Sequence, residues 1–182
     1  EEIEQLLMPV INRLIAEVHL LPASESHHHS GVGGLFVHSI QCATTAATEM
    51  ERRLPLAAET LEERYHGKKP WIVGAVVMML IHDTGKAFDM EVRSVSGDLW
   101  NPDEMPLLMW LEVNRFDQYF VCWKSGRIHK SHELRSLRLA YRRIIPDELM
   151  AYLGKRPSLG IVNAVEDAIV FGNGPLADLL KA

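Results

Sequence analysis

The feature that most constrains the fold of this chain is an apolar run that ends abruptly in polar residues. Residues 71–81 read WIVGAVVMMLI, and the five residues that follow are His82, Asp83, Thr84, Gly85 and Lys86. A run of this length is compatible with a buried strand or with a central helix. Its Met-Met-Leu segment and the glycine at a C-terminal cap position favour a helix. The sequence therefore predicts a buried helix that delivers His82 and Asp83 at its end.

Helical spacing of apolar residues and closing prolines or glycines predict most of the remaining structure. We expect further helices over residues 3–20, 34 to 51–53, 56–65, 129–145, 147–153 and 159–171. Residues 88–100 alternate loosely around Ser96-Gly97-Asp98, which predicts a β-hairpin, and residues 119–123 would add a third short strand. The predicted fold is mainly α, with a small β-hairpin or three-strand insertion around residues 88–123.

Length and composition place the chain among single globular domains. Its 182 residues contain no internal repeat and no linker, so we expect one domain over residues 1–182. The first residues are neither an initiator methionine nor a signal peptide, which suggests excision from a longer protein. No wholly apolar run reaches the roughly 18 residues of a membrane span. Cys42 and Cys122 are too few for a disulfide framework, so we expect reduced thiols and a cytoplasmic protein.

Positive charge is concentrated in one part of an acidic chain. The net charge is −5, yet residues 122–156 hold nine Lys/Arg against three Asp/Glu. Arg135, Arg138 and Arg142 would share one helix face, with Arg143 on a neighbouring stripe. Such a stripe can bind the phosphates of DNA, or it can be a solvated helix face, and the sequence leaves both open.

Histidine and carboxylate residues outside the apolar run point to a divalent metal. His38 lies one turn into a helix entered through Gly33-Gly34, where a lone histidine is more often a packed core residue. Asp167 lies in a helix otherwise suited to burial, so its carboxylate needs a metal or an arginine as partner. Combined with His82 and Asp83, these residues predict a centre for Mn, Fe, Zn or Mg that activates a phosphate ester.

The order of these residues resembles a known superfamily. His38, then His82-Asp83, then Asp167 is similar to the H…HD…D pattern of the HD metal-dependent phosphohydrolases, and HDTGK matches their HDxGK string. Nearly the whole chain resembles something narrower, the N-terminal domain of TraI-type conjugative relaxases of the MOBH class. The stretches that carry this resemblance are residues 21–24 (LPAS), residues 27–38 (HHHSGVGGLFVH), the HDTGK string, and His132 with the Leu/Arg-rich helix that ends at Pro146.

This resemblance implies an HD-like helical bundle that nicks one DNA strand at a transfer origin. It brings with it a divalent cation, DNA that is single-stranded or nicked, other conjugation proteins as partners, and a bacterial cytoplasm. Some HD proteins bind two metals, which makes His132, and less so His129, candidate ligands for a second ion. For both histidines the alternative is a surface pair on one helix face.

Several nearby residues are candidates for catalysis. One or more of His27, His28 and His29 would bind a metal or contact the scissile phosphate, and the alternative is an ordered loop at the site entrance. Lys86 would neutralise a phosphate oxygen, or complement the dipole of the helix before it. The nucleophile is open between a histidine, a water activated by the metal, and a tyrosine; the tyrosines are Tyr65, Tyr119, Tyr141 and Tyr152.

Two other functions fit the same residues. The first is a free-standing HD phosphohydrolase that acts on a nucleotide or cyclic nucleotide, which needs the metal site but no basic stripe. The second is a non-catalytic HD fold that binds DNA or partner proteins. The resemblance favours the relaxase, in which His38, His82, Asp83 and Asp167 hold the metal and Arg135, Arg138, Arg142 and Arg143 contact DNA.

Overall fold

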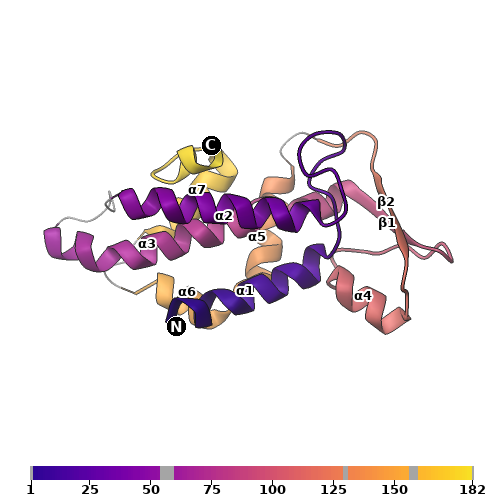
Figure 1. The fold of residues 1–182 in the computed structure, drawn as a ribbon, viewed down its shortest axis with the longest axis horizontal. Helices are drawn as coiled ribbons and strands as arrows, with labels where there is room; N and C mark the ends of the chain where they lie inside the picture. Colours follow the sequence, from indigo (N-terminus) through magenta and orange to yellow (C-terminus); the bar gives the residue numbers. More distant parts are fainter. Residues whose placement is uncertain (1, 54–59, 129–130, 156–159, 182) are drawn as a thin grey trace.

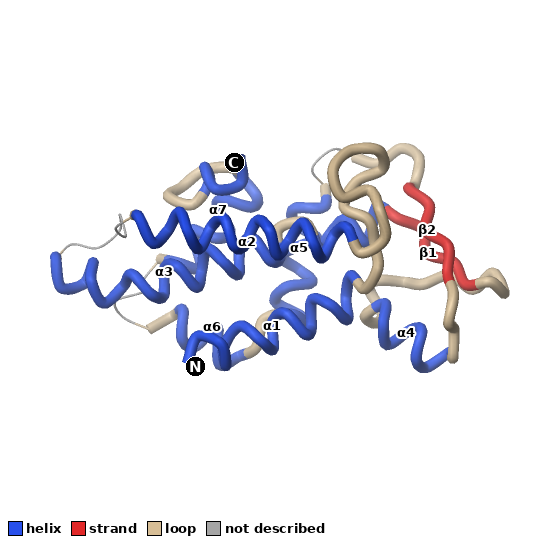
Figure 2. Tube along the Cα trace, in the orientation of Figure 1, coloured by secondary structure: helices blue, strands red, loops and turns tan. Residues whose placement is uncertain are grey.

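A computed structural model describes residues 2–53, 60–128, 131–155 and 160–181 (Figure 1). This part of the chain is mainly helical, with seven α-helices and one pair of strands (Figure 2). The α-helices are α1 (Glu2–Val18), α2 (Gly34–Arg52), α3 (Leu61–Ile81), α4 (Leu107–Asn114), α5 (His132–Leu139), α6 (Asp147–Leu153) and α7 (Ile161–Phe171). The remaining elements are β1 (Met90–Ser94), β2 (Tyr119–Trp123), and three short helices, η1 (Thr84–Asp89), η2 (Ala140–Ile144) and η3 (Ala177–Lys181).

The apolar run forms the second half of α3, as predicted, and this half is the centre of the core. Met78, Leu80 and Ile81 are each at most 1% exposed. The helix packs against α1, α2, α6 and α7, and residues 71–81 are accordingly apolar on every side, with only Ile72 and Val76 partly exposed. A Cβ on Gly74 would overlap the side chain of Ile161, which places α7 directly against α3 at this point.

Among the described residues, one helical segment, His66–Asp89, is long and apolar enough to cross a membrane. However, 72% of its most apolar stretch is buried inside the fold. Burial of this kind is what the central helix of a helical bundle shows.

The paired glycines before α2 serve two different purposes. Gly33 precedes the helix with φ of 73°, a left-handed conformation that suits glycine. At Gly34 the constraint is space, because a Cβ would overlap the carbonyl group of His29. The two glycines therefore allow the histidine-rich loop to lie against the start of α2.

The predicted β insertion is present, but its strands pair differently. β1 pairs antiparallel with β2, from Met90 opposite Trp123 to Ser94 opposite Tyr119. The turn after Ser94 forms, with the Gly97 N–H donating to the Ser94 carbonyl at 3.1 Å. The return arm folds back on β1 through an isolated bridge between Arg93 and Leu99, with the Ser94 N–H donating to Asp98 and the Trp100 N–H donating to Val92. The predicted turn is therefore present, but the strand that pairs along the whole of β1 comes from residues 119–123 rather than from the return arm.

The predicted helix over residues 129–145 has a composite structure. Its first residues lie outside the described part of the chain, and α5 begins at His132. At Ala140 the α-helix gives way to the π-helical turn η2, which ends before Pro146. The predicted helix at 147–153 is confirmed as α6, and that at 159–171 as α7, whose described residues begin at Ile161. The helices α4 and η3 were not predicted.

Candidate metal centre

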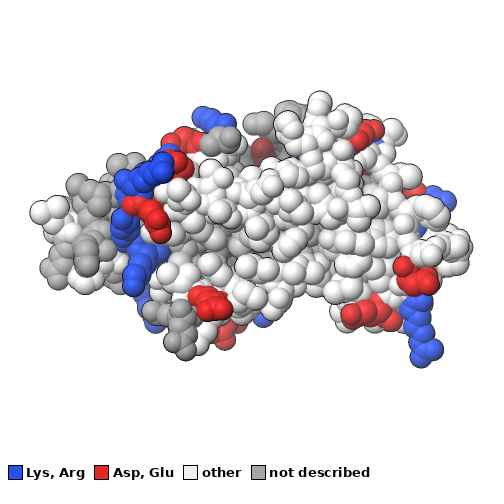
Figure 3. Space-filling view, viewed as in Figure 1, with Lys and Arg blue, Asp and Glu red and all other residues white. Residues whose placement is uncertain are grey.

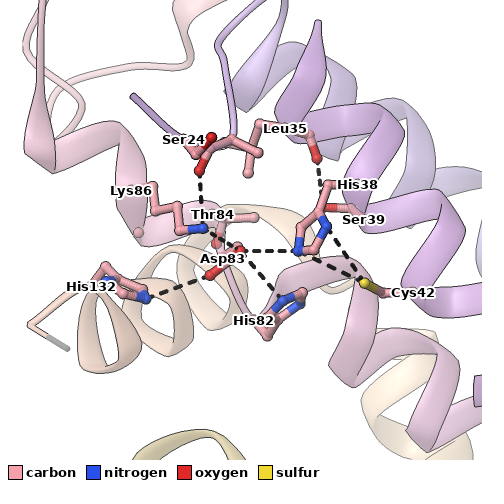
Figure 4. A network of polar contacts seen from close by, with 12 residues as sticks. Ser24, Leu35, His38, Ser39, Cys42, His82, Asp83, Thr84, Lys86 and His132 are labelled. Atoms are coloured by element: carbon pink, nitrogen blue, oxygen red, sulfur yellow. Dashed lines mark hydrogen bonds and ion pairs between the residues drawn. The ribbon is translucent and has the colours of Figure 1, made fainter. Parts of the chain in front are cut away.

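Three parts of the chain that are distant in sequence bring polar side chains to one point. His38 comes from α2, His82 and Asp83 from the end of α3, Lys86 from η1, and His132 from the first turn of α5 (Figure 4). Asp83 lies in the middle, with its side chain only 9% exposed. The convergence arises because α3 packs closely on α2 while α5 packs on η1.

The carboxylate of Asp83 is the hub of this cluster. Its Oδ2 lies 3.2 Å from His38 Nε2, 3.4 Å from His82 Nε2 and 2.6 Å from Lys86 Nζ. Its Oδ1 lies 3.5 Å from His132 Nε2. Burial would raise the pKa of Asp83, but hydrogen bonds from His132 and His38 and the charge of Lys86 hold it well below its usual range. Asp83 is therefore a carboxylate, the form that ligates a metal.

His82 is oriented as a metal-ligating histidine would be. Its Nδ1 lies 2.8 Å from the carbonyl oxygen of Met79, so Nδ1 carries the proton and donates it there. Burial lowers the pKa of His82, which favours the neutral ring. In that tautomer the unprotonated Nε2 of His82 faces the Asp83 oxygen. Both atoms are hydrogen-bond acceptors, so a cation between them would stabilise their close approach. A backbone carbonyl that fixes the ring in this way is the usual outer partner of a histidine ligand.

His38 differs from His82 in exposure and in charge. Its side chain is 27% exposed. The hydrogen bond to Asp83, followed by one to Cys42, raises the pKa of His38 to about 9. His38 thus carries a proton where no cation replaces it.

Gly85 and Ser136 hold the end of α3 in place. The Ser136 Oγ accepts a 2.8 Å hydrogen bond from the Gly85 N–H and donates a 2.7 Å hydrogen bond to the His82 carbonyl. A Cβ on Gly85 would overlap the His132 carbonyl and the Ser136 nitrogen. Only glycine lets α5 approach this closely, and that approach brings His132 to Asp83.

An outer carboxylate faces the second ring nitrogen of His132. Asp89 Oδ2 lies 3.8 Å from His132 Nδ1, an ion-pair distance rather than a hydrogen bond. Asp89 also receives a 3.0 Å hydrogen bond from Arg135. The arrangement positions His132 as a peripheral member of the cluster. His129 lies outside the described residues, so its predicted role has no structural counterpart here.

Of the predicted histidine triplet, one member reaches the cluster. The ring of His29 lies 5.5 Å from the ring of His38, centroid to centroid. His27 and His28 are exposed. Ser24 closes the loop on itself, accepting from the His27 N–H at 3.0 Å and donating to the His28 carbonyl at 2.9 Å.

Lys86 links the loop to the centre. Its ammonium group donates to Asp83 Oδ2 at 2.6 Å and to the carbonyl oxygen of Ala23 at 3.0 Å. The amine is thus adjacent to the position that a cation on Asp83 would occupy. A role toward a phosphate oxygen would require it to exchange these partners.

Cys42 is a member of the cluster that the sequence reasoning missed. Among the described residues, the donor atoms of His38, Cys42 and His82 lie within 4.8 Å of one another and could hold a metal. The available signal was helical spacing, since Cys42 is four residues after His38 on α2.

Asp167 was predicted as a ligand, and the structure does not place it in that donor group. It lies near the C-terminal end of α7 and is partly exposed, with Gly174 close to its Cβ. Its role as a ligand stays a prediction.

One family model matches the whole chain. That model is the TraI_2 family, described as "Putative helicase", and the match covers residues 1–182. The chain belongs to the TraI_2 family. None of the curated proteins matches it, and none of the solved structures does. The 182 residues of this TraI_2 chain contain no G-x-x-x-x-G-K-[ST] string, the phosphate-binding loop of ATP-driven motors.

The four arginines predicted to bind DNA in this TraI_2 chain fall into two groups. Arg143 is 14% exposed and contacts Glu17 through Nε at 2.6 Å. Its Nη2 also donates to the Pro102 carbonyl at 2.6 Å, so Arg143 stabilises the fold. Arg135 and Arg138 pair with Asp89 and Asp103 and lie over the Phe88 ring, yet their side chains remain 36% and 53% exposed. Arg142 is exposed.

The helix α5, which carries Arg135 and Arg138, lies behind α1 and α2 in the view of Figure 1. The near face has few charged side chains in its middle, and Lys, Arg, Asp and Glu gather toward its two ends (Figure 3).

A cavity of about 880 Å³ is lined in part by residues 30–32, α4 and β2.

The hydroxyl groups of two candidate tyrosine nucleophiles have hydrogen-bond partners. The Tyr119 hydroxyl lies 3.0 Å from Nδ1 of His19. Tyr141 donates to Glu166 at 2.7 Å. Both hydroxyl groups have partners outside the metal centre, and the side chain of Tyr65 lies outside the described residues.

Proposed function

We propose that this TraI_2 chain is the metal-dependent DNA-nicking domain of a conjugative relaxase, of the HD superfamily and the MOBH class. The observation that carries the proposal is the convergence of His38, His82 and His132 on the buried carboxylate of Asp83. Membership of the TraI_2 family suggests a TraI protein involved in conjugation, and hence DNA as the substrate.

In this proposal His38, His82 and Asp83 hold the cation, with His132 beside them. A divalent cation there would polarise a phosphoryl oxygen and lower the pKa of a water molecule. Asp83 supplies the negative charge, and the Met79 carbonyl keeps His82 in the ligating tautomer. His29 would exchange a proton with the attacking or leaving oxygen, a role supported by the 5.5 Å between its ring centroid and that of His38.

The test is the nicking of supercoiled plasmid DNA that carries the transfer origin of the parent element. We expect conversion to the relaxed form with Mn²⁺ or Zn²⁺, loss of the activity with EDTA, and a loss of at least about 100-fold in Asp83→Asn. The exposed Asp117→Asn is the matched control and should behave as wild type. Failure of wild type and control alike to nick DNA under any metal would contradict the proposal.

DNA contact by α5 is tested separately, by the salt dependence of single-stranded DNA binding. Each phosphate contact contributes about 0.7 to the slope of log K against log salt. The double variant Arg138→Ala/Arg142→Ala should reduce the slope by about 1.4. An unchanged slope would remove these arginines from the interface.

The free-standing phosphohydrolase is the second candidate, because the cluster around Asp83 does not require DNA. Turnover of nucleoside triphosphates or cyclic nucleotides, without measurable affinity for DNA, would favour it. Equal DNA binding by metal-free wild type and Asp83→Asn, without cleavage, would favour the non-catalytic alternative.

A further inference from the structure

The two cysteines of this chain have contrasting surroundings. Cys122 is exposed on β2. Cys42 is half-buried on α2, and its Sγ lies 3.7 Å from both Nδ1 and Nε2 of His38 (Figure 4). The same sulfur lies within 4.8 Å of the donor atom of His82. One thiol is thus part of the candidate metal centre and the other is remote from it in the fold.

The spacing of the donor atoms distinguishes between coordination geometries. Zn²⁺ binds thiolate at about 2.3 Å and imidazole or carboxylate at about 2.0–2.1 Å. Tetrahedral angles then separate neighbouring sulfur and nitrogen by about 3.6 Å, and nitrogen and oxygen by about 3.3 Å. Right angles would give about 3.1 Å and about 2.9 Å. The observed separations are 3.7 Å for Cys42–His38, and 3.2 Å and 3.4 Å for His38–Asp83 and His82–Asp83. The donors that lie within 4.8 Å of one another are those of His38, Cys42 and His82, and this group does not include Asp83.

We propose that Cys42 is a thiolate ligand, so that the centre is tetrahedral and selects Zn²⁺ over Mg²⁺ or Mn²⁺. Thiolate is a soft ligand that suits zinc, whereas Mg²⁺ takes oxygen ligands in octahedral geometry. The proposal rests on the metal centre proposed above, but it does not depend on which phosphate ester is cleaved. Binding would release the thiol proton to solvent and form one Zn–S bond, with no change in oxidation state.

Cobalt(II) is the probe that reports the sulfur directly. Titration of the metal-free 182-residue chain with Co²⁺ should produce the visible bands of tetrahedral cobalt together with a near-ultraviolet thiolate-to-cobalt charge-transfer band. The charge-transfer band should disappear in Cys42→Ala. It should persist in Cys122→Ala, which is the matched control because it removes the other thiol.

Affinity gives a second readout that does not depend on spectroscopy. Zn²⁺ affinity, measured by competition with a chromophoric chelator, should fall by about 10-fold to 100-fold or more in Cys42→Ala. Mn²⁺ affinity should change far less, since its contacts are to nitrogen and oxygen. Cys42→Asp should restore part of the Zn²⁺ affinity without the charge-transfer band, which separates loss of a ligand from loss of packing.

Three outcomes are decisive. Visible cobalt bands without a charge-transfer band in wild type would overturn the role of Cys42 while leaving the proposed metal centre intact. Retention of wild-type Zn²⁺ affinity by Cys42→Ala would do the same. No binding of Co²⁺ or Zn²⁺ by folded wild type, judged by circular dichroism, would overturn both this inference and the metal centre on which it rests.

Discussion

The hydroxyl of Ser136 donates a 2.7 Å hydrogen bond to the main-chain carbonyl of His82, 54 residues away in sequence. The same oxygen accepts the N–H of Gly85, so one buried side chain clamps both sides of the turn that presents Asp83. The geometry of the proposed ligands thus depends on a residue that touches none of their side chains.

Replacement of Ser136 by alanine should therefore destabilise the protein. A buried N–H and a buried carbonyl would lose their partner, at a cost of about 1–3 kcal/mol. Urea unfolding would measure this, with the exposed Ser125→Ala as a control that shifts by less than about 0.5 kcal/mol. Equal stability of the two variants would show that the clamp contributes nothing.

Gly85→Ala should have a larger effect than any substitution at Gly31. The new methyl group would overlap the main chain of α5, whereas nothing lies within 4 Å of a Cβ at Gly31. We expect Gly85→Ala to lose about 1–3 kcal/mol or more of stability and to weaken metal binding by displacing His132. Chemical denaturation and metal titration of both alanine variants would check this, and a wild-type metal affinity in Gly85→Ala would contradict it.

Metal removal should lower the melting temperature of the protein. An ion at about 100 times its dissociation constant stabilises the folded state by about 2.7 kcal/mol. For a chain of this size that corresponds to about 5–11 °C. Differential scanning calorimetry with Zn²⁺ and with EDTA measures the difference, which should vanish in His38→Ala and persist in the exposed His27→Ala.

The pair Glu17–Arg143 should behave as a structural ion pair. Their side chains are 3% and 14% exposed, so Arg143→Ala would leave a buried carboxylate and cost about 3–5 kcal/mol. Arg142→Ala, on the adjacent exposed residue, should cost less than about 0.5 kcal/mol. Thermal unfolding distinguishes the two. A small loss of stability in Arg143→Ala, together with a weaker dependence of DNA affinity on salt, would show instead that Arg143 contacts DNA.

The sequence was a good guide wherever one local pattern determines structure. The apolar run identified α3 and the position of Asp83 at its end, and Gly33-Gly34 marked the start of α2 and so the place of His38. Cys42 also follows His38 by four residues, the spacing of one helix face, but only histidines and carboxylates were considered as ligands.

The remaining features depend on contacts between distant segments. Ser136 is an ordinary residue in the sequence, and Gly85 stood out there only as a helix cap and as part of the HDTGK string. The contact between them arises only where α5 packs on η1. In the sequence Arg143 is one basic residue among several. Its structural role follows from its contact with Glu17, which lies 126 positions earlier. Likewise, β1 finds its partner beyond α4, because alternation within residues 88–100 does not specify which strand pairs with which.

The loop that carries His29 is anchored along its length. The Ala23 N–H donates to the His29 carbonyl, Gly33 N–H to Leu20, and Leu35 N–H to Leu21. The backbone has therefore lost its conformational freedom during folding, before any ligand arrives. A DNA strand or nucleotide that binds beside His29 would contact a loop that is already ordered. Binding would then not include the entropic cost of ordering this loop.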